Sequence, residues 1–229
     1  MSTQNSTEGQ SSAAFADVVG CVLAGGLSRR MGGGDKSLIH IGGSPMLSRV
    51  LERLSPQVGH VIINANGDPN RFASYQCTVV RDPIDGFAGP LAGILAGLMW
   101  TRNHKPEATH VLTVAADTPF FPIDLVERFR HRSQQDGQAI VLAASDGKQH
   151  PVFGLWPVQL ADDLHTWLAE NQSRKVLHWV ERHPNLSESF DGLDLNGARL
   201  DPFFNANTPE DIDLANTLAG AMAEKDNTA

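Results

Sequence analysis

Short apolar runs alternate with longer segments of helical periodicity along the chain. Several runs are apolar at consecutive positions, which is typical of parallel strands covered on both faces. Start signals mark some of the longer segments: Ser44 with Pro45, and Thr208 with Pro209 and Asp211. The runs predict strands at 18–24, 60–66, 77–81, 110–116, 139–144 and 152–156. The longer segments predict helices at 44–54, 89–100, 122–135, 157–170, 173–183 and 208–223.

This alternation predicts an α/β fold with a doubly wound, mostly parallel sheet and helices on both faces, a Rossmann-like arrangement. We find no internal repeat and no interdomain linker, so we expect a single domain at residues 18–223. Residues 1–17 are mostly small and polar and are predicted to form a disordered tail, with a second tail at 224–229. The chain start lacks the features of a secretion signal, and no apolar run reaches membrane-spanning length, so we expect a cytoplasmic protein.

Composition narrows the choice of function. The chain has 229 residues, of which 41% are hydrophobic, enough for a sizeable core. Its formal net charge of -8 argues against a nucleic-acid-binding protein, because such proteins normally carry a basic face. Cys21 and Cys77 lie in predicted strands and show no metal-ligand or redox spacing, so we expect them to be small buried hydrophobes.

Polar or glycine-rich groups follow four of the predicted strands. The glycine-rich loop 25–34 follows the first strand, Asn64 and Asn66 end the second, Asp82 follows the third and Asp117 the fourth. Turns favour these residue types in any case. Because ligands of doubly wound folds bind at the carboxyl ends of the strands, we expect these groups to meet at one edge of the sheet.

The glycine-rich loop favours a phosphate ligand. Glycines let backbone N–H groups converge on an anion, while Arg30 adds a guanidinium fork and Lys36 a mobile ammonium group. The loop is not a P-loop, because Asp35 precedes Lys36 where that motif needs glycine, and it is not a GxGxxG dinucleotide loop. The alternative is a flexible surface loop whose basic side chains are merely solvated.

Asp117 is the candidate metal ligand. It ends a predicted buried strand, directly before the turn residues Thr118 and Pro119. Magnesium prefers one or two carboxylates together with phosphate oxygens, so a single carboxylate beside a phosphate-binding loop suits it. The alternative is that Asp117 only caps the helix that follows.

The glycine-rich loop also resembles the signature of a known family. Residues 23–38, LAGGLSRRMGGGDKSL, are similar to nucleotidyltransferases that carry LAGG, RMG and a downstream lysine, and within them to molybdenum cofactor guanylyltransferases, the MobA family. The resemblance implies a nucleotide-diphospho-sugar transferase-like fold. The three glycines at 32–34 depart from the family pattern, a difference that bears on how tightly the loop closes and not on the site itself. Further matching segments are GPLAGI (89–94), DTPF (117–120) and NANTPED (205–211), and the resemblance spans roughly residues 18 to 215.

The resemblance implies a reaction and the residues that carry it. The family joins GMP from GTP to molybdopterin with Mg²⁺, so Asp117 would hold the metal while Lys36 and Arg30 neutralise phosphate charge. Gly25 leaves room for a purine edge where related cytidylyltransferases carry alanine, which favours guanine. Asp82 would help to read the guanine. The residues implied for GTP are Leu23, Ala24, Gly25, Gly26, Lys36, Asn64, Asp82 and Asp117.

The carboxyl half of the domain would meet the acceptor, whereas the amino half would bind the nucleotide. Molybdopterin bears a phosphate and a polar pterin edge, which suit cations and amides. Capping or ordinary surface duty is the alternative for each acceptor residue. We expect GTP and molybdopterin as partners, transient contact with proteins that make or receive the cofactor, no nucleic acid, no membrane, and a monomer. The residues implied for molybdopterin are His150, Arg174, Lys175, Asn205 and Asn207.

Two other functions stay open beside guanylyl transfer. One is a related nucleotidyltransferase that acts on a cytidylyl or sugar-phosphate substrate, and the other is a non-catalytic module that binds GTP or the cofactor. The joint presence of Arg30, Lys36 and Asp117 favours catalysis. A phosphate monoester with a second pKa of about 6 is largely dianionic at neutral pH, so the nucleophile needs no general base.

Overall fold

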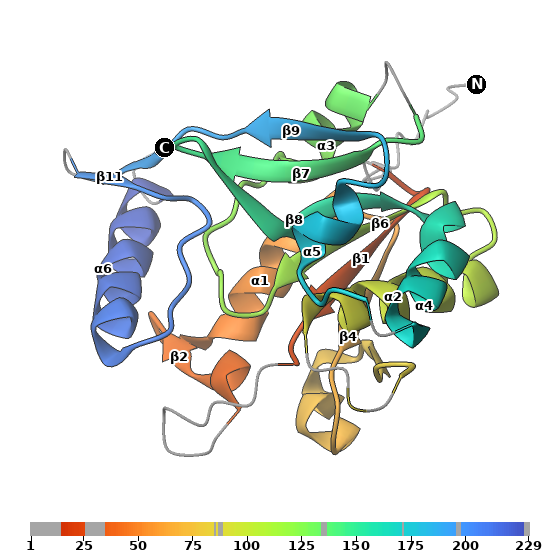
Figure 1. Cartoon of the computed structure of the whole chain (residues 1–229). Helices are drawn as coiled ribbons and strands as arrows, with labels where there is room; N and C mark the ends of the chain where they lie inside the picture. The colour runs from red at the N-terminus through yellow and green to blue at the C-terminus, as the bar shows by residue number, and fades with distance from the viewer. Residues whose placement is uncertain are drawn as a thin grey trace, which may run out of the picture.

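The computed structural model of the chain describes residues 15–25, 35–84, 86, 89–133, 137–170, 172–195 and 198–226. Its centre is a seven-stranded sheet in the order β5-β4-β1-β6-β8-β7-β9 (Figure 1). Every pairing in this sheet is parallel except those that β8 makes with β6 and with β7. Its strands are β1 (Val18–Leu23), β4 (His60–Asn64), β5 (Thr78–Val80), β6 (His110–Ala115), β7 (Ile140–Ser145), β8 (Lys148–Pro157) and β9 (Asn185–Ser189). Short antiparallel pairs join β2 (His40–Ile41) to β3 (Ser44–Pro45) and β10 (Leu193–Leu195) to β11 (Ala198–Leu200).

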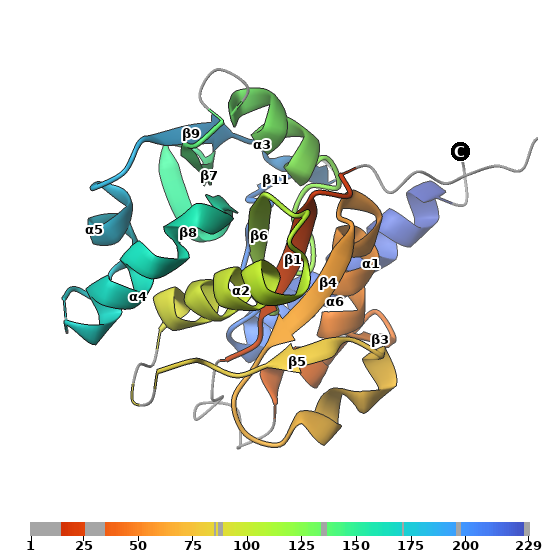
Figure 2. The ribbon, with the colours of Figure 1, turned by 90° about the vertical axis from the view of Figure 1, so that its right-hand side faces the viewer.

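Helices cover both faces of the sheet, as the sequence predicts. Successive side chains of a strand point to opposite faces, so Val18 and Val22 of β1 join the core with α1 and α3, whereas Val19 and Cys21 join the core with α2, α4 and α5. Figure 2 shows α1 and α2 on opposite sides of β1 and β4. The α-helices are α1 (Met46–Leu54), α2 (Pro90–His104), α3 (Leu125–Ser133), α4 (Ala161–Ala169), α5 (Val176–Val180) and α6 (Pro209–Asp226). The 3₁₀ segments are η1 (Lys36–Leu38), η2 (Ser55–Gln57), η3 (Pro69–Tyr75) and η4 (Val158–Leu160).

Helix α6 packs beside the sheet rather than on the central strands. Its Ala215 and Leu218 form a small apolar cluster with Ile41 of β2, with Met46 of α1 and with Phe120, which follows β6. The cluster anchors the start of α6 near the carboxyl end of β6. The loop before α6 is thereby placed where Asp117 leaves the sheet.

Some predicted element boundaries are wrong. Ser44 does not cap α1: it pairs in β3, and the residue before the helix is Pro45, which makes no side-chain cap. Strand β9 was not predicted, because its residues alternate between exposed and half-buried positions and form no apolar run. The antiparallel β8 begins at Lys148, earlier than the apolar segment alone indicates.

The described residues include contacts made before the predicted domain start at residue 18. The carbonyl of Phe15 accepts a hydrogen bond from the Val18 N–H at 3.1 Å. The Asp17 carboxylate accepts from the Thr109 hydroxyl at 2.7 Å and pairs with Arg130 at 2.9 Å. At the other end, α6 continues to Asp226, into the predicted C-terminal tail. Within the described parts of the chain, no helix is both long and apolar enough to cross a membrane.

Both cysteines are free thiols. Cys21 is fully buried, and burial, followed by the nearby charge of Asp82, raises the pKa of its thiol to about 12. Cys77 is half-buried, and burial raises its pKa as well. The prediction of a small buried hydrophobe is therefore confirmed for Cys21, whereas Cys77 is only partly buried.

Candidate active site

The carboxyl ends of four neighbouring parallel strands lie along one edge of the sheet. These strands are β5, β4, β1 and β6, in that order. Just beyond the strands, the Ala24 N–H donates to the Asn64 carbonyl at 2.9 Å, and the Ala116 N–H donates to the Leu23 carbonyl at 3.1 Å. The described residues at the ends of these strands therefore lie along the same edge of the sheet.

An amide–carboxylate cluster, formed by Asn64, Asn66 and Asp82, lies at the β4 and β5 end of this edge. Asn64 Nδ2 donates to Asp82 Oδ1 at 2.9 Å, and Asn66 Nδ2 donates to Asp82 Oδ2 at 2.7 Å. The Asp82 N–H returns a bond to Asn66 Oδ1 at 3.1 Å. Asn64 is buried, at 4% exposure. Neutral amides therefore hold both oxygens of this carboxylate in fixed positions.

Two glycines face Asn64 in opposite ways. A Cβ atom on Gly93, in the first turns of α2, would lie 2.4 Å from Asn64 Oδ1 and 2.9 Å from Leu23 Cδ2. Glycine is therefore required for α2 to approach the ends of β1 and β4. A Cβ atom on Gly25 would lie 4.0 Å from Asn64 Oδ1, which is an ordinary contact. Among the described neighbours, protein packing does not require glycine at residue 25.

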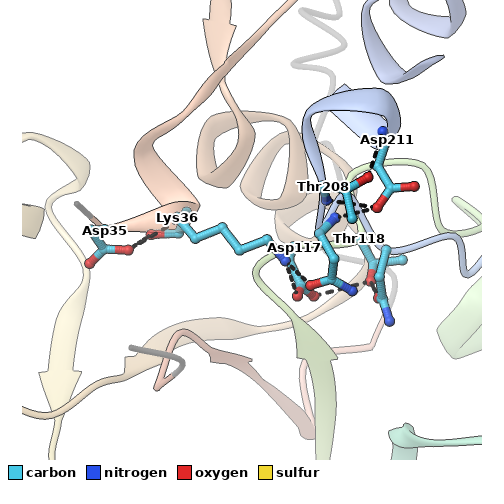
Figure 3. A network of polar contacts seen from close by, with 9 residues as sticks. Asp35, Lys36, Asp117, Thr118, Thr208 and Asp211 are labelled. Atoms are coloured by element: carbon cyan, nitrogen blue, oxygen red, sulfur yellow. Dashed lines mark hydrogen bonds and ion pairs between the residues drawn. The ribbon is translucent and has the colours of Figure 1, made fainter. Parts of the chain in front are cut away.

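A lysine–carboxylate cluster lies at the β6 end of the same edge (Figure 3). We define it as Lys36, Asp117, Thr118, Asn205 and Asn207. Lys36 Nζ pairs with Asp117 Oδ2 at 2.8 Å and also donates to Asn207 Oδ1. The Thr118 hydroxyl donates to Asn205 Oδ1, and the Ala206 N–H donates to the Asp117 carbonyl at 3.0 Å. Two segments far apart in the sequence thus surround one carboxylate.

Asp211 holds the loop that carries Asn207. Its Oδ2 accepts from the N–H groups of Asn207 and Thr208, each at 2.8 Å, while the Asp211 N–H donates to Thr208 Oγ1 at 3.2 Å. This capping box confirms the predicted start of α6. Burial raises the pKa of Asp211, but these hydrogen bonds and the charge of Lys36 outweigh it and lower the pKa below its ordinary value.

His150 lies in a third group, with Ser145, Asp201 and Phe203. The Ser145 hydroxyl contacts His150 Nε2 at 2.6 Å and donates to Asp201 Oδ1 at 2.8 Å. The imidazole stacks on the Phe203 ring with 4.6 Å between centroids. Burial lowers the pKa of His150, Lys148 lowers it further, and Asp201 opposes both. The Asp201 carboxylate contacts the Ser145 hydroxyl and not His150 Nδ1. A serine nucleophile needs a base that a third group orients through that second ring nitrogen, so this group has a different arrangement.

The predicted site residues fall into separate places. Asn207 accepts from Lys36, and Asn205 accepts from Thr118, the residue after Asp117. His150 stacks on Phe203, close in sequence to Asn205. Arg174 and Lys175 are exposed in the segment between α4 and α5. Gly26 and Arg30, with most of the glycine-rich loop, lie outside the described residues.

Sequence reasoning missed several residues of this edge. Asn66 was noted at a strand end but given no role, and Thr118 was read only as a turn residue. Arg71 and the carboxylate of Asp35, which form an ion pair of 2.7 Å, had no role either. The Asp-x-Ser spacing at Asp35 and Ser37 is a capping signal that could have drawn attention to Asp35.

The arrangement suits a metal ion that takes few protein ligands. No group of three or more His, Cys, Asp or Glu side chains that could hold a metal occurs among the described residues. Asp117 offers one carboxylate whose side chain is 31% exposed. A cation that completes its coordination with phosphate oxygens and water, as magnesium does, fits this donor set.

Most of the chain is similar to known proteins. The MobA-like NTP transferase domain matches residues 20–186. A protein named molybdenum cofactor guanylyltransferase from Bradyrhizobium sp. (strain ORS 278) is 49% identical over 209 residues, covering 91% of this chain and 96% of that protein. A protein of the same name from Mesorhizobium japonicum is 44% identical over 206 residues, covering 90% and 98%.

Solved structures share the fold at lower identity. Molybdopterin-guanine dinucleotide biosynthesis protein A from Archaeoglobus fulgidus is 22% identical and superposes with a TM-score of 0.67, covering 88% of this chain and 98% of that one. The CMP:2-keto-3-deoxy-manno-octonic acid synthetase is 13% identical with a TM-score of 0.63, covering 91% and 99%. The predicted fold class is confirmed.

Proposed function

The chain belongs to the molybdenum cofactor guanylyltransferases, which carry a MobA-like NTP transferase domain, and we propose that it transfers GMP from GTP to the phosphate of molybdopterin and releases pyrophosphate. The observation that carries the proposal is the pairing of Lys36 with Asp117 at the same sheet edge as the amide–carboxylate cluster. One end of this edge suits a base and the other suits phosphates and a cation.

Guanine suits the amide–carboxylate cluster. Its Watson–Crick edge presents two adjacent N–H donors, whereas adenine and cytosine present one amino group beside a ring acceptor. The amides of Asn64 and Asn66 occupy part of the acceptor capacity of Asp82, and a carboxylate has about four acceptor sites in all. Gly25, with Leu23, Ala24 and Gly26, would let the base and ribose lie against bare backbone.

The phosphates suit the lysine–carboxylate cluster. Asp117 would hold Mg²⁺, and a bound magnesium ion supplies charge neutralisation at the phosphates. The Lys36 ammonium would bind phosphate oxygens in place of the Asn207 and Asp117 oxygens that it now contacts. Arg30 would add a guanidinium from the glycine-rich loop. Neutralising these charges in fixed positions favours the step in which the leaving pyrophosphate gains negative charge.

The attacking group requires no proton removal. The molybdopterin phosphate, a monoester with a second pKa of about 6, is largely dianionic at neutral pH. The protein therefore has to hold the molybdopterin phosphate in line with the GTP phosphates and to neutralise their charges. Asn205 and Asn207 are close to Asp117 and suit the acceptor phosphate or pterin edge. His150, Arg174 and Lys175 complete the proposed acceptor set.

The proposal also assigns one substrate to each half of the domain and gives the enzyme a location and an oligomeric state. The amino half would bind GTP and the carboxyl half molybdopterin. The enzyme would act in the cytoplasm as a monomer and contact proteins that make or receive the cofactor only transiently. Light scattering on the purified protein would contradict the monomer if it gave a larger mass.

One incubation tests the reaction. Purified protein, molybdopterin, magnesium and each nucleoside triphosphate in turn are combined, and pyrophosphate and product mass are measured. We expect pyrophosphate and the guanine dinucleotide product with GTP. A product formed with CTP instead would indicate the related nucleotidyltransferase, and GTP binding without pyrophosphate release would indicate a binding module.

A further inference from the structure

Arg71, in the 3₁₀ segment η3, contacts three groups at once, one of them in the amide–carboxylate cluster. Its NH2 donates to the Asn66 carbonyl at 2.8 Å and its NH1 donates to the Asp68 carbonyl at 3.1 Å. Its Nε lies 2.7 Å from Asp35 Oδ2. That Nε is buried and has no partner with hydrogen-bond geometry among the described residues, so the contact with Asp35 is an ion pair. A guanidinium holds its donors in one rigid plane, whereas the three donors of a lysine rotate on a flexible stem.

Asp35 divides its carboxylate between Arg71 and η1. Its Oδ1 accepts from the Ser37 N–H at 3.1 Å and from the Ser37 hydroxyl at 2.7 Å, which caps the helical turn that begins with Lys36. Its Oδ2 faces Arg71. The side chains are 16% exposed for Asp35 and 27% for Arg71, so water screens this pair less than a surface pair.

A continuous path of contacts therefore joins the two clusters of the candidate site. From Asp117 it runs to Lys36, whose extended side chain bridges the distance from the Asp35 end to Asp117 (Figure 3). From Lys36 it passes through the Asp35 cap to Arg71, and from Arg71 to the Asn66 carbonyl. Asn66 is bonded in turn to Asp82.

We propose that Arg71 and Asp35 are a positioning pair that fixes the backbone of Lys36 relative to the amide–carboxylate cluster. The pair touches no reacting atom. It sets the spacing between the place of the base and the place of the phosphates, so that one nucleotide reaches both. This inference rests on the proposed function, because it needs a nucleoside triphosphate that spans the two clusters.

The physical reason is the freedom of lysine. Lys36 has a long, flexible side chain, so its ammonium group is placed well only if its backbone and its contacts are fixed. The Asp35 cap fixes the backbone of Lys36, and Arg71 fixes Asp35. Without Arg71, the Lys36 ammonium group keeps its charge but its position is no longer fixed, so phosphate binding weakens. The amide–carboxylate cluster keeps its own hydrogen bonds.

A double-mutant cycle tests the pair through binding. The dissociation constant of GTP, with magnesium, is measured by calorimetry for the full chain and for Arg71→Gln, Lys36→Ala and the double variant. We expect Arg71→Gln to weaken GTP binding about tenfold with Lys36 present and by less than roughly twofold in the Lys36→Ala background. An equal loss in both backgrounds overturns the inference, because Arg71 would then act without Lys36.

Arg81 provides a matched control. It donates to the Gly67 carbonyl at 2.9 Å, in the loop that Arg71 also holds, through a contact that does not involve Asp35. Arg81→Gln should change GTP binding by less than roughly twofold, equally in both backgrounds. Coupling to Lys36 as large as that of Arg71 would mean that general support of the loop, and not the ion pair, matters, and would overturn the inference.

A second pair of variants covers a folding failure of Arg71→Gln. Asp35→Asn keeps an acceptor for Ser37 and removes the charge facing Arg71, and Arg71→Lys keeps the charge and removes the fork. Each should weaken GTP binding about as much as Arg71→Gln. The combined Asp35→Asn and Arg71→Lys variant should bind GTP no more weakly than either single variant. If the wild-type chain itself fails to bind GTP, the proposed function falls and this inference with it. If the wild type binds and the losses simply add, only this inference falls.

Discussion

The two clusters at the sheet edge differ in charge, and the difference shows what each can bind. In the amide–carboxylate cluster, neutral amides hold Asp82, so its oxygens are fixed, and no Lys, Arg or His of the described residues forms an ion pair with them. In the lysine–carboxylate cluster, an ammonium group lies directly on Asp117. The first suits a neutral edge of N–H donors, and the second suits phosphates with a cation. A base and its phosphates have this pair of properties.

The largest expected effect falls on the charged cluster. Asp117→Asn keeps the shape of the side chain and removes the charge that would hold magnesium, so we expect turnover to fall about 10²- to 10³-fold. The measurement is pyrophosphate release with GTP and molybdopterin at saturating magnesium, beside thermal melting to verify the fold. Near wild-type turnover in a folded variant would remove the metal role of Asp117.

A smaller effect, with a different signature, is expected from the neutral cluster. Asp82→Asn replaces a carboxylate acceptor by an amide and should reduce kcat/KM for GTP roughly 10- to 150-fold, the value of a hydrogen bond to a charged group. Inosine triphosphate lacks the 2-amino group of guanine and serves as the comparison substrate. The variant should prefer GTP over it less than the wild type does, and an unchanged preference would contradict base reading by Asp82.

The two glycines that face Asn64 separate binding from folding. Gly25→Ala adds a methyl group that the described protein atoms tolerate at 4.0 Å, so we expect the KM for GTP to rise about tenfold with an unchanged melting temperature. Gly93→Ala is the matched variant. Its Cβ would meet Asn64 Oδ1 at 2.4 Å, so it should lower the free energy of unfolding by about 1–3 kcal/mol. Equal melting and equal KM in both variants would remove the distinction.

The smallest expected effect concerns His150, which belongs to neither cluster. Burial lowers its pKa, so the folded protein resists a proton that the unfolded chain accepts near pH 6.5. Stability is therefore unaffected by this group above that pH and decreases as the pH falls through 6.5 toward the lowered pKa. His150→Gln should reduce the fall in melting temperature between pH 7 and pH 5.5. An unchanged fall would exclude His150 as a contributor.

The sequence predicted the strands of the main sheet other than β9, and the sheet edge, because their signals are local. Consecutive apolar residues in β1 and β6 indicated buried parallel strands, and the rule for doubly wound folds then brought Asn64, Asp82 and Asp117 to one edge. The Thr208 and Asp211 capping box was also readable from its spacing. The family followed from the LAGG and RMG segments and is confirmed by the similarities to known proteins.

The contacts that cross the chain could not be predicted in this way. Nothing in the pattern around Arg71 indicates that it meets Asp35, because the ion pair depends on how η3 folds against Asp35, the residue before η1. The approach of Asn207 to Lys36 likewise depends on α6 packing on β2 and Phe120. The resemblance suggested Asn205 and Asn207 as acceptor residues, but not that they lie against Lys36 and Thr118.

The central claim is that both clusters bind one nucleotide, with the base at Asp82 and the phosphates at Lys36. The most direct test is a crystal structure of the protein with GTP and magnesium. We predict guanine N–H groups within hydrogen-bond distance of the Asp82 carboxylate, and phosphate oxygens within reach of Lys36 and of a metal ion on Asp117. A triphosphate bound away from Lys36 and Asp117, or a base on another surface, would contradict the account.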